Sequence, residues 1–326
     1  MSEPSAKKSG RPVAGGAAAR AHDDALVDRM LACLPVTQQA RNLLAFYELP
    51  RIRTVFDLLE RHTPDVPLRL LNIGFLNGVV PFLLFHLDRA DRLHITSSER
   101  GGSKSLASAA SLQAGGLFPA GRHDVVDLDL DRLNEDGTLA GWETRRETFD
   151  WVLLGEVIEH IPSIHAPKIL RFFHRVLAPG GRLVITTPNL HGFKMRLRHL
   201  LGIDFTHDPL GDETMGYPHV NLFSSRQLCD LARANRFAVN DVLYRDFTAG
   251  PRRHGNDSRA VARAAEALRL MTLSRLAPAW REDLILCFQK RTAAQPTSPV
   301  YGAYNSGFLQ GLRAVAFATR TDAEPS

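Results

Sequence analysis

Apolar residues recur with two different periods along the chain, and the alternation between them indicates the fold class. The stretches "LRLLNI" (68–73), "FDWVLLG" (149–155) and "RLVITTP" (182–188) are nearly continuous apolar runs, which are typical of strands covered on both faces. Between the last two, "HAPKILRFFHRVL" (165–177) repeats apolar residues at helical spacing. Strands that alternate with helices in this way predict an α/β fold, in which helices cover both sides of a parallel sheet.

Several segments fall outside this alternation and predict the domain organisation. Residues 1–22 are rich in Ala, Gly, Ser, Pro and Lys, so we expect a disordered tail. Helical spacing over 23–62 predicts an N-terminal helical extension that serves as a lid. The main domain is expected at 63–291, with a substrate loop at 189–218 and a helical insertion at 249–281. The remaining residues, 292–326, resemble a flexible C-terminal tail.

Composition narrows the possible partners and the compartment. The net charge is +5 and the pI is about 9.3, but the basic residues are scattered along the chain, so nucleic acid is not the expected partner. The three cysteines, Cys33, Cys229 and Cys287, lie far apart without a C-x-x-C pair, so we expect a reducing, cytoplasmic location. The longest apolar stretch, near residues 79–87, is far short of the roughly 20 residues that span a bilayer, so no membrane association is expected.

One block of the sequence resembles a known family. The stretch "GEVIEHIPSIHAPKILRFFHRVLAPGGRLVITTPN" (155–189), followed by "HVNLFSSRQLCDLARANRF" (219–237), is similar to the class I S-adenosylmethionine-dependent methyltransferases of the small-molecule group. The resemblance implies a Rossmann-like, doubly wound, mostly parallel sheet of seven strands whose last strand is antiparallel. It also implies that S-adenosylmethionine is the cofactor and that a small molecule accepts the methyl group.

The turn after the first strand departs from the family pattern, which is an acidic residue followed by three glycines at alternate positions. This chain has Asn72, Gly74 and Gly78, with Leu76 in place of the middle glycine. A glycine at such a turn lets the backbone approach the cofactor without a Cβ in the way. Leu76 therefore narrows the predicted pocket, and the amide of Asn72 replaces a charged acceptor.

The resemblance also implies which side chains surround the cofactor. Glu99 would hold the ribose hydroxyls, with Ser97 or Ser98 as alternatives in the same place. Asp127 and Leu128, after the third strand, would lie beside the adenine. The complete implied set is Asn72, Gly74, Phe75, Gly78, Glu99, Asp127, Leu128, Gly155 and Glu156.

Acids and histidines cluster directly after the strand at 149–155. Glu156, Glu159 and His160 would share one face of a helical turn because they are spaced i, i+3 and i+4. The resemblance brings His219 towards them. A divalent metal such as Mg²⁺ or Mn²⁺ could bind these four residues, as it does in the similar small-RNA 2′-O-methyltransferases; the alternative is that they only shape the turn.

A base helps methyl transfer to a hydroxyl, and imidazole suits that role near neutral pH. We expect His160 to be this base, then His219, with His191 of the substrate loop as a third candidate. The leading hypothesis is therefore O-methylation of a small molecule. The alternatives are a metal-assisted RNA 2′-O-methyltransferase and a non-catalytic binding subunit, the latter suggested by Leu76 and Asn72.

Overall fold

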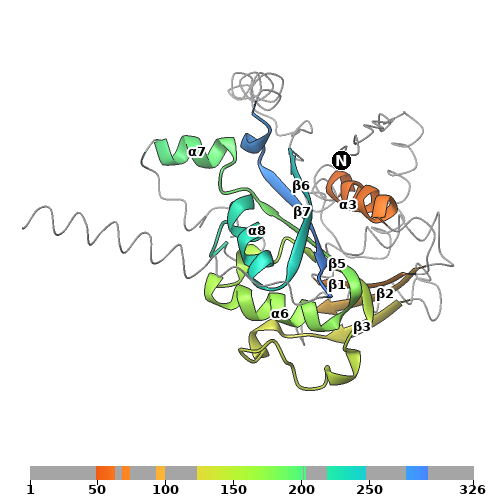
Figure 1. Cartoon of the computed structure of the whole chain (residues 1–326). Helices are drawn as coiled ribbons and strands as arrows, with labels where there is room; N and C mark the ends of the chain where they lie inside the picture. The colour runs from red at the N-terminus through yellow and green to blue at the C-terminus, as the bar shows by residue number, and fades with distance from the viewer. Residues whose placement is uncertain are drawn as a thin grey trace, which may run out of the picture.

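The computed structural model describes residues 49–62, 68–73, 93–99, 123–200, 202, 219–246 and 277–292. Within them the chain forms one seven-stranded sheet, with strand order β3-β2-β1-β4-β5-β7-β6 (Figure 1). The strands are β1 (Leu68–Ile73), β2 (Leu93–Glu99), β3 (His123–Asp127), β4 (Phe149–Gly155), β5 (Leu177–Pro188), β6 (Phe237–Arg245) and β7 (Asp283–Lys290).

The directions of the strands confirm the predicted α/β class. Strands β3, β2, β1, β4 and β5 run parallel to one another, whereas β7 is antiparallel to both β5 and β6. The chain runs from β1 outward to β3 and then crosses back to β4 on the other side of β1. This reversal creates a switch point between the carboxyl ends of β1 and β4, which is where open α/β sheets bind ligands.

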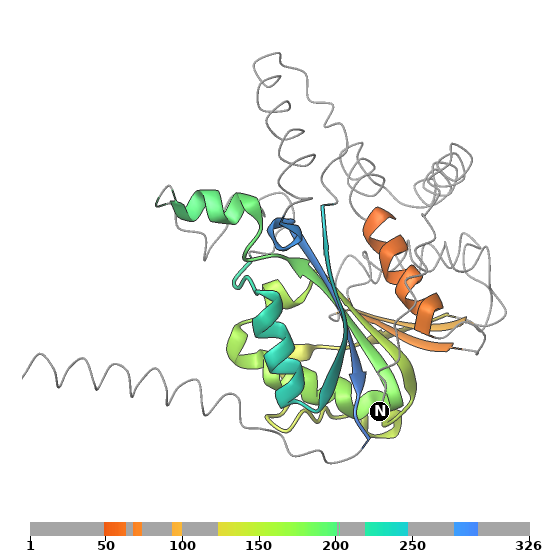
Figure 2. The ribbon, with the colours of Figure 1, turned by 45° about the horizontal axis from the view of Figure 1, so that its top comes forward.

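Helices α6 (Ala166–Val176) and α8 (Ser225–Ala234) cover one face of the sheet (Figure 2). Phe173 and Leu228 of these helices pack with Leu71 and Leu286 of the sheet in a single apolar core. Helix α8 starts at a capping box, in which Ser224 and Gln227 satisfy each other's backbone amides. Helix α6 agrees with the helix predicted at 165–177, and β1, β4 and β5 include the strands predicted from the hydrophobic pattern.

Helix α3 (Leu49–His62) lies on the opposite face of the sheet (Figure 2). It buries Val55, Leu58 and Leu59, which share one side of the helix. Because helices cover both faces, the doubly wound arrangement is confirmed.

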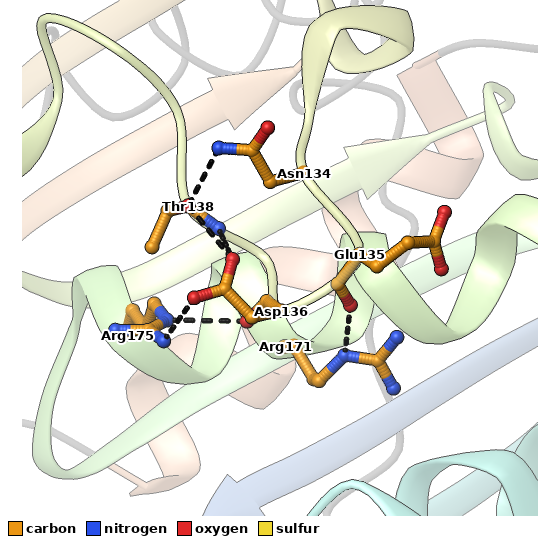
Figure 3. A network of polar contacts seen from close by, with 6 residues as sticks. All are labelled: Asn134, Glu135, Asp136, Thr138, Arg171 and Arg175. Carbon is orange, nitrogen blue, oxygen red and sulfur yellow. Dashed lines mark hydrogen bonds and ion pairs between the residues drawn. The ribbon is translucent and has the colours of Figure 1, made fainter.

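The segment between β3 and β4 is fastened to α6 by the polar contacts in Figure 3. Arg175 forms an ion pair with Asp136, and Nε of Arg171 donates to the carbonyl of Glu135. Gly137, with a φ of 79°, sits so close to α6 that a Cβ would lie 2.6 Å from Cβ of Arg171. Glycine is therefore required for this approach.

The segment expected as a substrate loop, 189–218, contains helix α7 (Phe193–Leu200), which extends away from the sheet (Figure 1). Its expected remainder, 203–218, lies outside the described residues. So do the predicted N-terminal tail (1–22), all but the first residue of the predicted C-terminal tail (292–326), the first part of the extension (23–48), and most of the insertion predicted at 249–281.

Short 3-10 turns complete the described chain: Leu130–Arg132, Glu143–Arg145, η4 (Ile158–His160), η5 (Ser163–His165) and Pro278–Trp280. No helix among the described residues is long and apolar enough to cross a membrane.

Candidate active site

The carboxyl ends of four parallel strands bring most of the predicted cofactor residues to one edge of the sheet. Glu99 ends β2 and pairs in register with Asp127, which ends β3. Gly155 ends β4, next to the end of β1, where Asn72 is buried. This edge, at the carboxyl ends of β1 to β4, is called the carboxyl edge below.

The remaining predicted cofactor residues differ in how the structure places them. Leu128 is buried and packs in the apolar core, while Asp127 is exposed. The glycine-marked turn with Gly74, Phe75 and Gly78 lies outside the described residues. Of the two alternatives to Glu99, Ser98 is buried and its hydroxyl donates to the carbonyl of Asn72.

Glu156 has an unusual backbone conformation directly after β4. Its φ is 51°, in the left-handed region that residues other than glycine rarely adopt. Its backbone N–H donates to the carbonyl of Thr186, 3.0 Å away. Strained conformations of this kind persist where surrounding contacts hold them, and they concentrate at functional sites.

Arg51 of α3 reaches this strained turn and forms an ion pair with Glu156, with a distance of 2.7 Å between Nη1 and Oε1. Only 2% of the Arg51 side chain is exposed. A buried arginine is costly unless it is paired, so this contact fixes α3 over the carboxyl edge.

Arg51 was not among the residues predicted from the sequence, although a signal for it exists. It precedes Val55, Leu58 and Leu59 by four, seven and eight positions, so it lies on the buried side of an amphipathic helix. A charged residue on the apolar side of a helix indicates a specific buried partner.

Glu159 belongs to η4 and is completely buried. Burial raises the pKa of its carboxyl from 4.5 to about 7, although the neighbouring His160 and a hydrogen bond from Thr187 oppose this increase. The Thr187 hydroxyl donates to Oε2 at 3.0 Å, whereas Oε1 has no hydrogen-bond partner within the described part of the chain. An orphaned buried oxygen of this kind is a candidate ligand atom.

The segment that carries His219 docks on η4. The backbone N–H groups of Val220 and Asn221 both donate to the carbonyl of Glu159, at 2.8 and 3.0 Å. The Asn221 side chain donates to the carbonyl of Ile161. These contacts bring the rings of His160 and His219 together, with 4.8 Å between their centroids.

The structure thus brings together three of the four predicted metal ligands. The ligand atoms of Glu159, His160 and His219 all lie within 4.8 Å of one another. One carboxylate oxygen and two imidazole nitrogens suit a divalent cation, so the residues fit such an ion. Glu156 is not in this group, because its carboxylate is paired with Arg51.

His191, the third candidate base, lies elsewhere, in the turn before α7. Its backbone N–H donates to the side chain of Asn189, and its carbonyl accepts from Arg196. Burial, followed by the charge of Arg196, lowers the pKa of the His191 ring. Both of these hydrogen bonds use backbone atoms of His191, and they hold the turn before α7.

A family model described as "Methyltransferase domain" matches residues 52–242, which is more than half of the chain. The protein is therefore a class I S-adenosylmethionine-dependent methyltransferase. The match extends from α3 to β6 and so includes the carboxyl edge and the group formed by Glu159, His160 and His219.

Curated relatives include the "Ubiquinone biosynthesis O-methyltransferase, mitochondrial" of Rattus norvegicus and its namesake in Bos taurus. The rat protein is 30% identical over 167 residues, which cover 49% of this chain and 46% of the rat protein. The bovine protein is 31% identical over 167 residues, covering 49% and 43%, respectively. The chain thus spans about half the length of the curated relatives it matches.

Solved structures that are similar to this chain include an S-adenosylmethionine-dependent methyltransferase from Methanosarcina mazei. It has 15% sequence identity and a TM-score of 0.48, and the match covers 72% of this chain and 98% of the other. Another is the Burkholderia thailandensis 1,6-didemethyltoxoflavin-N1-methyltransferase with bound 1,6-didemethyltoxoflavin and S-adenosylhomocysteine. It has 16% identity, a TM-score of 0.44, and coverage of 86% and 93%.

Proposed function

We propose that this protein transfers the methyl group of S-adenosylmethionine to a hydroxyl oxygen of a small molecule. The observation that carries the proposal is the placement of His160 and His219 beside the buried Glu159 at the carboxyl end of β4. The names of the curated relatives, which are O-methyltransferases, support oxygen as the acceptor atom.

The cofactor supplies an activated methyl group when it is bound. Its binding is assigned to the carboxyl edge, where Asn72, Glu99, Asp127, Gly155 and Glu156 lie around the switch point of the sheet. The Arg51–Glu156 ion pair would keep α3 over this edge and limit the access of water.

The chain's own contribution to the chemistry is a base and a fixed geometry. We assign the base to His160, which is partly exposed and so can face an acceptor. As the acceptor oxygen attacks the methyl carbon, the carbon–sulfur bond breaks and the hydroxyl proton passes to the imidazole. His219, held against His160 by the Val220 and Asn221 contacts, positions that ring.

A divalent metal would be held by Glu159, His160 and His219 and would lower the pKa of an acceptor hydroxyl. Treatment with a chelator separates this possibility from a metal-free base. Loss of turnover that Mg²⁺ or Mn²⁺ restores supports the metal, and full turnover of metal-free protein contradicts it.

The test of the main proposal is turnover of the full chain, measured as S-adenosylhomocysteine released from a panel of small hydroxyl compounds. His160→Ala should lower kcat by about 10²–10⁴-fold, the usual contribution of a general base. His94→Ala is the matched control, because His94 lies near the amino end of β2, away from the carboxyl edge. Unchanged rates in His160→Ala across pH would contradict the assignment.

Calorimetry with S-adenosylhomocysteine tests cofactor binding separately. No heat of binding and no thermal shift would favour a non-catalytic subunit. The group formed by Glu159, His160 and His219 also keeps an RNA 2′-O-methyltransferase as a second candidate. That function predicts RNA binding whose affinity falls steeply with salt.

We further propose a reducing location such as the cytoplasm. The two cysteines among the described residues, Cys229 and Cys287, are both buried free thiols, which supports this assignment.

A further inference from the structure

A second group of possible ligands lies on the sheet face beneath α3. It consists of His62 at the end of α3, Asp241 of β6 and Cys287 of β7. The imidazole nitrogen, carboxylate oxygen and thiol sulfur all lie within 4.8 Å of one another. Nε2 of His62 and Oδ2 of Asp241 are already in contact, at 2.7 Å. These three residues are called the α3 group below.

A β-bulge in β6 places Asp241 on this face. Val239 pairs with Phe288, and Asp241 pairs with Cys287, so two residues of β6 advance while β7 advances by one. In a regular strand Val239 and Asp241 would share a face, because side chains alternate. The bulge instead leaves Val239 against the apolar core and turns Asp241 towards Cys287 and α3.

The three side chains of the α3 group differ in their exposure to solvent. Cys287 is fully buried, whereas 21% of the His62 side chain and 18% of the Asp241 side chain are exposed. The His62 ring also lies near Trp151, with 6.4 Å between the ring centroids. An ion could therefore enter from the side of His62 and Asp241 and reach the thiol beneath them.

Arg61 and Arg182 place positive charge near this group, and both oppose the rise in the pKa of the Cys287 thiol. Nη1 of Arg61 lies 3.4 Å from Oδ1 of Asp241, but 57% of the Arg61 side chain is exposed, so it can turn towards water. Burial, and then the carboxylate of Asp241, raise the pKa of the Cys287 thiol to about 12. A cation placed between the sulfur and the carboxylate would compensate the desolvated negative charges of both.

We propose that His62, Asp241 and Cys287 bind a divalent transition metal of the zinc type, with a water molecule completing the coordination. Nitrogen, oxygen and sulfur donors in a four-coordinate site are the set that Zn²⁺ accepts. The Cys287 sulfur bonds to the metal, and its proton is released to solvent. No electron transfer is involved.

The required movement is small. Ligand atoms around tetrahedral zinc lie about 3.3–3.8 Å apart, given bonds of roughly 2.0–2.3 Å. The 2.7 Å contact between Nε2 of His62 and Oδ2 of Asp241 would lengthen to this separation. Rotation of the side chains accomplishes this, since α3 and the sheet already hold the three residues side by side. The ion would then fasten the end of α3 to the sheet.

Titration of the full chain with Co²⁺, under a reductant that contains no thiol, tests the proposal. A cobalt–thiolate charge-transfer band should appear and saturate at one equivalent. Cys287→Ser should abolish this band. Cys229→Ser is the matched control, because Cys229 is the other buried free cysteine of the described chain, and it should leave the band unchanged. His219→Ala should also keep the band, because the group at the carboxyl edge contains no sulfur.

His62→Ala and Asp241→Asn test the same site in case Cys287→Ser misfolds, because both change partly exposed side chains. Each should weaken Co²⁺ binding by about tenfold or more, because loss of even an outer-shell partner costs that much. Zn²⁺ should raise the Tm of the wild type more than that of these variants. The absence of a thiolate band, or its persistence in Cys287→Ser, would overturn the proposal and leave a simple His62–Asp241 tether.

Discussion

Aromatic and aliphatic side chains such as Leu71, Phe173 and Leu286 fill the layer between the sheet and helices α6 and α8. The carboxyl edge of the same sheet buries charged groups instead, including Arg51 and Glu159. Non-directional burial stabilises the first region, whereas the second depends on particular partners at particular distances. The comparison indicates that the apolar layer maintains the fold and that the carboxyl edge carries the chemistry.

The largest expected effect on stability lies in the apolar layer. Phe173→Ala removes a fully buried ring from the centre of α6 and should lower the free energy of unfolding by about 3–5 kcal/mol. Urea denaturation measures this change. Ile164→Ala is the control, because Ile164 is 78% exposed just before the same helix and should shift stability by no more than about 0.5 kcal/mol. Equal losses in both variants would contradict the distinction between core and surface.

At the carboxyl edge, replacing both members of the Arg51–Glu156 ion pair should cost less stability than replacing Arg51 alone. Arg51→Met removes the ion pair with the Glu156 carboxylate and should cost about 2–4 kcal/mol. The double variant Arg51→Met/Glu156→Gln should recover at least half of that loss, because no uncompensated charge remains. Thermal and urea unfolding of both single variants and the double variant complete the cycle. Losses that simply add would show that the pair contributes no coupling energy.

Glu159 should make stability depend on pH. Its carboxyl has an ordinary pKa of 4.5 and a raised pKa of about 7 in the folded chain, chiefly because of burial. At pH values between 4.5 and about 7, this carboxyl is ionised in the unfolded chain but protonated in the folded chain. The Glu159 carboxyl should therefore make the folded chain less stable as the pH rises through this window, by about 1 kcal/mol per pH unit.

Glu159→Gln cannot titrate, so its stability should be flatter than that of the wild type between pH 4.5 and 7. The measurement is the urea midpoint at several pH values. Glu143→Gln, on an exposed loop, is the control and should follow the wild type. A wild-type profile that rises with pH in this window, relative to Glu159→Gln, would contradict the raised pKa.

Much of the site could be predicted from the sequence because its residues are close neighbours along the chain. Glu159 and His160 follow the strand at 149–155 directly, and parallel strands place their carboxyl ends at one edge. The prediction for Glu156 was incomplete, because the sequence does not reveal that Arg51, more than a hundred residues earlier, reaches its carboxylate.

The sequence by itself determined the α/β fold, through the alternation of continuous apolar strands with amphipathic helices, since these periods reflect which faces are buried. Only the tertiary structure decided the partners: the docking of His219 on η4, the Arg51–Glu156 pair, and the approach of His62 to Asp241 and Cys287. Such contacts join residues far apart in the chain, and a single bulge in β6 decides which face Asp241 occupies. Local periodicity contains no information on long-range pairing of this kind.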